Sequence, residues 1–270
     1  MKSQQREDRR RWDGRGLGLA VALSLAGCGG EDTGPSQPPP LVVFSSEVTR
    51  VEIEVDYALG AEPYLDSLEF VGNPFSLTRE NLTALFAGSA KEVVVPMDYS
   101  FMEVIEAPPG PYDGSDIVAI AANHRSRLST GDAATYYAVW LNGFYQKNGK
   151  TDEAVLGAAL PDYGIVAMFK PAVRKLEHPA LRSLSRFTEQ SAFVHEMGHV
   201  LGLVDTGIPQ VVPHEDAAHD GHCSNPDCVM YWANEGAETL RRFAAQFATS
   251  GSDVLFDANC LADAMAAGSR

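Results

Sequence analysis

The chain has 270 residues, of which 45% are hydrophobic and 21% are charged, and its formal net charge is −15 at pH 7. An apolar fraction of this size is ordinary for a globular protein with a buried core, whereas the negative charge disfavours binding to nucleic acid or to anionic lipid headgroups. No uninterrupted apolar run is long enough for a membrane-spanning helix, which needs about 18 residues or more.

The first 27 residues have the features of an export signal. Several basic residues precede a short apolar run at 17–25, which is the order found in secretory signal peptides. The run leads into Leu-Ala-Gly-Cys, which resembles the bacterial lipobox, and the resemblance implies cleavage before Cys28 and lipidation of that residue. Residues 28–40, rich in Gly and Pro, then form a flexible linker. We therefore expect a protein of the bacterial cell envelope that is attached to a membrane only through its lipid.

Residues 41–270 are predicted to form one compact domain. Apolar and polar residues alternate with a period of two over 48–57, which predicts a half-buried strand. The elements predicted after it, in chain order, are a helix at 76–86, strands at 91–97, 135–146, 155–161 and 163–170, a helix that carries residues 194–203, and helices at 237–247 and 257–267.

The sequence VHEMGHVLGL at 194–203 indicates a metal site. His195 and His199 are four residues apart, so on a helix they lie on one face and can bind the same ion. Glu196 lies beside them, where its carboxylate could accept a proton from an activated water, and Gly202 suits the end of the helix. The opposite face of this helix is apolar and is predicted to pack against the sheet. Its residues are Phe193, Met197, Val200 and Leu201.

The motif, with Gly202 three residues after the second histidine and Met230 downstream, resembles that of the metzincin zinc endopeptidases. The resemblance implies an α+β zinc-protease domain with a twisted mixed sheet, an antiparallel edge strand, an active-site helix and a helical C-terminal part. It implies one catalytic zinc ion, with Met230 in a Met-turn beneath it. It further implies a protein or peptide substrate that pairs with the edge strand. Residues 155–161 resemble that strand. We expect the protein to be a monomer.

The sequence leaves the third protein ligand of the metal ion undecided. The spacing after Gly202 points to Asp205, whereas the pattern H-C-x4-C-x-M that starts at His222 resembles the archaemetzincins, in which its histidine is the third ligand. We favour His222 because imidazole is the commoner ligand beside two histidines. His214 and His219 are further alternatives, and the carboxylates beside them could instead hold a structural calcium ion.

The cysteines predict at most one disulfide. If Cys28 is lipidated, Cys223, Cys228 and Cys260 remain, an odd number in an exported protein. Cys223 and Cys228 are close enough in sequence to form a bridge, which would clamp the loop that delivers His222. A second metal ion held by these thiols is not expected, because there are too few of them.

The predicted function is hydrolysis of peptide bonds by a zinc-activated water with Glu196 as general base. One alternative is an envelope lipoprotein that keeps the protease fold but only binds its partner. The intact set of His195, Glu196 and His199 argues against this alternative. Another is a zinc amidase acting on cell-wall material, which the motif does not distinguish from a peptidase.

Overall fold

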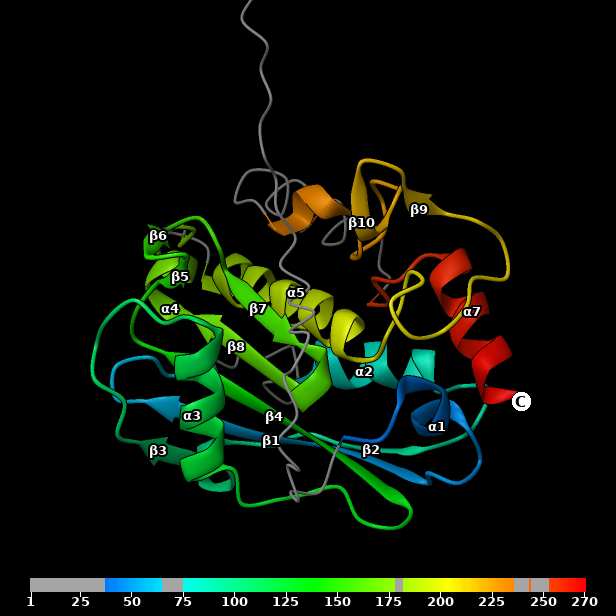
Figure 1. Cartoon of the computed structure of the whole chain (residues 1–270), viewed down its shortest axis with the longest axis horizontal. Coiled ribbons are helices and arrows are strands. Elements are labelled where there is room, and N and C mark those ends of the chain that lie inside the picture. Colours follow the sequence, from blue (N-terminus) through cyan, green and yellow to red (C-terminus); the bar gives the residue numbers. More distant parts are fainter. Residues whose placement is uncertain (1–36, 65–74, 178–181, 236–242, 244–252) are drawn as a thin grey trace, which may run out of the picture.

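The computed structural model describes residues 37–64, 75–177, 182–235, 243 and 253–270 (Figure 1). Cys28 and the predicted signal peptide lie outside the described residues, as does all but one residue of the helix predicted at 237–247. Within the described part of the chain, no helix is both long enough and apolar enough to cross a membrane.

The central sheet is mixed and has one antiparallel edge. Four strands run parallel in the order β2-β1-β4-β8, β3 pairs in parallel with the other end of β1, and β7 closes the sheet as an antiparallel neighbour of β8. This is the α+β fold with a mixed sheet and an antiparallel edge strand that was predicted. The strands of the sheet are β1 (Arg50–Ala58), β2 (Glu92–Val94), β3 (Glu103–Ile105), β4 (Ala133–Leu141), β7 (Gly157–Leu160) and β8 (Ile165–Phe169).

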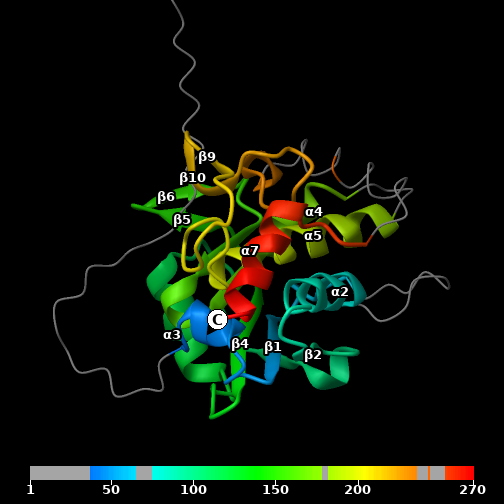
Figure 2. The same cartoon turned by 90° about the vertical axis from the view of Figure 1, so that its right-hand side faces the viewer.

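Helices cover both faces of this sheet. Figure 2 shows α3 (Gly114–His124) on one side and α2 (Ser76–Leu85) on the other, and α5 (Arg182–Val200) packs beside α2 and against β7 and β8. The remaining helices are α1 (Pro40–Phe44), α4 (Lys170–Arg174) and α7 (Ala258–Gly268), with 3-10 turns η1 (Tyr99–Phe101), η2 (Pro161–Tyr163) and η3 (Trp232–Glu235). Two hairpins complete the fold, β5 (Tyr145–Lys147) with β6 (Lys150–Asp152), and β9 (Glu215–Asp216) with β10 (His219–Cys223).

The apolar face predicted for the metal-binding helix is confirmed. All four of its residues are at most 2% exposed, and the Phe193 ring packs on Trp140 of β4 with the ring centroids 5.0 Å apart. Burial of each such side chain contributes about 1.5–3 kcal/mol. The sheet therefore holds α5 by its apolar face, and the histidines point away from the core.

A buried ion pair anchors α5 near its middle. Glu189 of α5 accepts hydrogen bonds from Lys170 Nζ (2.6 Å), from Trp140 Nε1 (3.1 Å) and from the backbone N–H of Tyr64 (2.6 Å). Burial raises the pKa of Glu189 and lowers that of Lys170. Because both side chains are at most 1% exposed, removing either partner would leave an uncompensated buried charge, at a cost of roughly 3–5 kcal/mol.

The prediction and the structure differ at two elements for identifiable reasons. The strand predicted at 135–146 is divided into β4 and β5, because the chain turns at Gly143, where a Cβ atom would lie 1.5 Å from Gly110 O. The helix α3 was not predicted from apolar periodicity. Its signal is a capping box, in which Asp113 accepts the N–H of Asp116 and the Asp116 side chain accepts the N–H of Asp113.

Candidate functional site

Three histidines from two separate segments meet at one point. His195 and His199 come from α5 and His222 comes from β10, and one ring nitrogen of each lies within 4.8 Å of the others. The Nε2 atoms of His195 and His199 are 3.1 Å apart. Two imidazoles on one tetrahedral zinc place their nitrogens about 3.3 Å apart. The cluster therefore has the donor atoms and the spacing of a three-histidine metal site.

Backbone carbonyls orient two of the rings. His195 Nδ1 donates to Val229 O (2.7 Å), and His222 Nδ1 donates to Asp220 O (3.0 Å). A proton held on Nδ1 leaves the Nε2 lone pair available to a metal, which is how ligand histidines are usually fixed. His195 is 2% exposed and His222 is fully buried. The rings are thus held in position by the protein itself.

The other sequence candidates for third ligand lie elsewhere. Asp205 is exposed, has φ +62° and, in the described part of the chain, belongs to neither group of side chains able to hold a metal. His219 donates to Asp216 (3.0 Å) and stacks on Trp232, with ring centroids 4.0 Å apart. Both metal-binding groups found among the described residues contain histidine. Neither is the all-oxygen set that calcium requires.

Glu196 lies against the edge strand of the sheet. A Cβ atom on Gly157 of β7 would lie 2.7 Å from Glu196 Cγ, so a side chain at this position would displace the carboxylate. Burial raises the pKa of Tyr145, with smaller contributions from the Asp113 and Glu196 carboxylates. Glu196 is 7% exposed. Glu196 thus follows His195 directly on α5 and packs against the first residue of β7.

Glycines allow close approach around the histidines. Met230 is fully buried, and its Sδ atom would lie 2.2 Å from a Cβ atom on Gly198, between His195 and His199. Gly202, with φ +76°, ends α5 as predicted, and a Cβ atom there would meet Gly207 Cα at 2.8 Å. Met230 thus packs against the backbone of α5 in the turn that carries the two histidines.

A second cluster of metal-binding side chains lies beside the first. His214, Cys223, Asp257 and Cys260 bring one ligand atom each within 4.8 Å of one another. Cys228 borders this cluster, since its Sγ atom is 3.6 Å from Cys260 Sγ. Three thiols and one imidazole are the ligand types of a four-coordinate structural zinc site. The sequence-based expectation counted only the thiols, and in the structure His214 lies beside them.

The cysteines of this cluster are free thiols in the structure. The disulfide predicted between Cys223 and Cys228 is not formed, and Cys260 is also free and buried. Hydrogen bonds from the Cys228 and Cys260 thiols hold the pKa of Cys223 well below its usual value. Backbone N–H groups of Asn225 and Asp257 donate to Cys223 Sγ and Cys228 Sγ, both at 3.4 Å. Such bonds stabilise negative charge on sulfur.

Hydrogen bonds orient the His214 ring as they would orient a metal ligand. Its Nε2 donates to Asp263 Oδ2 (2.7 Å), and its Nδ1 faces Cys223 Sγ (3.3 Å). Burial alone would lower the pKa of His214, but the hydrogen bonds to Asp263 and Cys223 outweigh it and raise that pKa. A carboxylate behind a ligand histidine fixes its ring and increases its basicity. Asp257 instead caps α7, accepting the N–H groups of Asn259 and Cys260.

The two clusters share one short loop. His222 precedes Cys223, and Cys228 precedes Val229, whose carbonyl orients His195. The sequence suggested His214 only as an alternative third ligand or as a neighbour of calcium. Its pairing with Asp263 was not predicted, because the two residues are 49 positions apart and belong to no common motif. The available signal was the odd number of cysteines, which a disulfide framework does not explain.

No protein-family model matches the chain, and no curated protein sequence matches it. Among solved structures, the chain is similar to the crystal structure of a zinc-dependent peptidase from Methanocorpusculum labreanum (strain Z). The two are 15% identical, with a TM-score of 0.44, and the match covers 78% of this chain and 99% of the other. At this level the likeness does not assign a function, so function must be judged from the side chains of the two clusters.

Proposed function

We propose that this protein is a zinc-dependent peptidase. The observation that carries the proposal is the convergence of His195, His199 and His222 beside Glu196, at the unpaired edge of the sheet. Three nitrogen ligands that leave one position open are typical of catalytic zinc, whereas structural sites use four protein ligands. A purely binding protein would have no need of a carboxylate next to such a site.

Each residue then has a distinct role. The Nε2 atoms of the three histidines would hold the ion, and Val229 O and Asp220 O fix two of the rings. When bound, zinc lowers the pKa of a water and polarises the carbonyl to be attacked. Glu196 accepts the proton of the attacking water and passes it to the leaving amine. The free edge of β7 offers backbone groups to an extended peptide, which is a general mode of peptide recognition.

We also propose that the protein binds a second, structural zinc ion. Cys223, Cys228, Cys260 and His214 would hold it, and four protein ligands leave no position for water. Because Cys223 follows His222 directly, this ion would tie the third ligand of the catalytic site to α7, which carries Cys260. This structural ion would be additional to the one catalytic zinc ion that the sequence predicts.

Digestion of casein and of a peptide library, with and without a chelator, tests the proposed activity. We expect cleavage that a chelator abolishes and that added zinc restores. Muropeptides assayed in parallel test the amidase alternative, because an amidase would release their peptides and leave casein intact. Zinc-loaded protein that cleaves neither substrate would contradict the proposal and favour the binding alternative.

Zinc content tests the second site. Elemental analysis of the purified protein should give two zinc ions per chain, and His214→Ala should lower this value toward one, since three thiols alone leave the tetrahedral set incomplete. His219→Ala is the matched control, because His219 lies in the same segment but stacks on Trp232 outside both clusters. One zinc ion in all three proteins would contradict the second site.

Attachment to the cell envelope through Cys28 is proposed from the sequence alone. It is supported by the Leu-Ala-Gly-Cys pattern and by the Gly- and Pro-rich linker that follows. If Cys28→Ser left membrane fractionation and mass unchanged, this part of the proposal would fail.

A further inference from the structure

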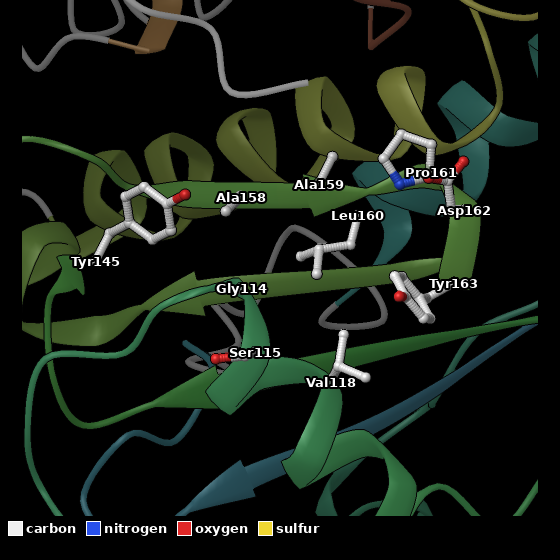
Figure 3. A pocket seen from close by; sticks show the side chains of 10 residues that line it. All are labelled: Gly114, Ser115, Val118, Tyr145, Ala158, Ala159, Leu160, Pro161, Asp162 and Tyr163. Carbon is white, nitrogen blue, oxygen red and sulfur yellow. The ribbon is translucent and has the colours of Figure 1, made fainter. Parts of the chain in front are cut away.

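A pocket opens along the edge strand on the face that α5 does not cover. Its volume is about 170 Å³, and it lies between β7 and the first turns of α3 (Figure 3). The side chains that shape it are those of Val118, Tyr145, Leu160 and Tyr163. Leu160 and Val118 point toward each other across it. These walls are aliphatic or aromatic.

Strand alternation divides β7 between two faces. Gly157 faces Glu196, and Ala159, which is 9% exposed, points toward α5 in Figure 3. Ala158 and Leu160 therefore point to the opposite face, and there they line the pocket. The strand thus has the proposed catalytic carboxylate on one side and the pocket on the other.

The outer edge of β7 has backbone groups available to another strand. Phe169 donates to Leu156 O at 2.9 Å, and in an antiparallel pair such bonded positions alternate. Ala158 and Leu160 therefore bond inward to β8, while Gly157 and Ala159 direct their N–H and C=O groups outward. In the described part of the chain, no hydrogen bond reaches these outward groups.

The direction of β7 determines which way a peptide paired with it runs past Glu196. The strand runs away from Glu196, since Gly157 is its first residue and the one that packs against the Glu196 side chain. A peptide paired antiparallel to β7 therefore runs toward Glu196, and the residues opposite Ala158 and Leu160 precede the bond to be cleaved. Directly opposite residues share a face, so these peptide side chains point toward the pocket.

We propose that this pocket selects substrates with a large apolar side chain on the N-terminal side of the cleaved bond. This inference rests on the proposed peptidase function, and it adds the substrate class. Leu160 is partly buried and Tyr163 is 38% exposed, so an apolar side chain would remove further apolar surface from water on both partners. An acidic side chain would instead meet Asp162 at the pocket and a chain of net charge −15.

The test compares two variants of the same helix. Val118→Asp places a charge in the pocket, and Ile120→Asp changes an equally aliphatic, partly buried side chain that does not line it. A library randomised at the four positions before the cleaved bond should show about 10-fold higher kcat/KM for Leu or Phe than for Ser or Asp at alternate positions. Wild type and Ile120→Asp should share this preference, and Val118→Asp should lose it.

Peptide-binding measurements test the pocket independently of catalysis. Matched fluorescent peptides with Leu or Ser at the selected position are titrated into Glu196→Ala protein with Val118 intact and with Val118→Asp. Tighter binding of the Leu peptide only when Val118 is intact supports the pocket, even if no protein cleaves peptides and the peptidase proposal fails. Cleavage without side-chain preference, or equal binding of both peptides, overturns the pocket while leaving the peptidase proposal standing.

Discussion

Replacing Glu196 with alanine should abolish peptide hydrolysis while both metal sites stay filled. Glu196 is assigned proton transfer and not ligation, and a positioned general base contributes about 10²–10⁴-fold to rate. The expected result is a fall in kcat of that size with unchanged zinc content. Single-turnover hydrolysis of a fluorogenic peptide, alongside elemental analysis, measures both quantities on the same preparation.

Glu196→Gln is the matched control for this experiment. Glutamine keeps the shape of the side chain and its packing against Gly157, but it cannot accept the proton. We expect the glutamine variant to be as inactive as the alanine variant. Near-normal turnover in either variant would show that another group is the base.

Replacing His222 with alanine should empty the catalytic metal site. Two protein ligands would remain, whereas loss of a residue that only orients a ligand typically costs about 10–100-fold in affinity or activity. The zinc content should fall by one ion per chain, and activity should fall by more than about 100-fold. Asp205→Ala should keep its zinc and its activity, because Asp205 is exposed and lies apart from the cluster.

Zinc measured in the two variants distinguishes the two ligands that the sequence leaves open. His222→Ala protein with full zinc content, beside Asp205→Ala protein that has lost an ion, would reverse the assignment. Circular dichroism of both variants checks that any loss of metal is not a loss of fold. Activity rescued by added imidazole would further indicate that the variant lacks a metal ligand and keeps the conformation of the loop.

The sequence by itself determined the features that depend on short-range geometry. The spacing of His195 and His199 places them on one helix face, and the alternation over 48–57 predicted β1 to within two residues at each end. Gly202 was predicted as the helix end, and its φ of +76° is a conformation that glycine adopts without a Cβ penalty. Each of these signals lies within a few residues of the chain.

Only the tertiary structure brought together residues that no periodic pattern relates. His222 lies 23 residues after His199, and the path of the intervening loop decides whether it or Asp205 meets the helix. His214 and Cys260 complete a cluster only because α7 packs beside β10, and the pocket exists only because the unpredicted α3 lies next to β7. Such contacts depend on chain closure over tens of residues, and local propensities do not encode that path.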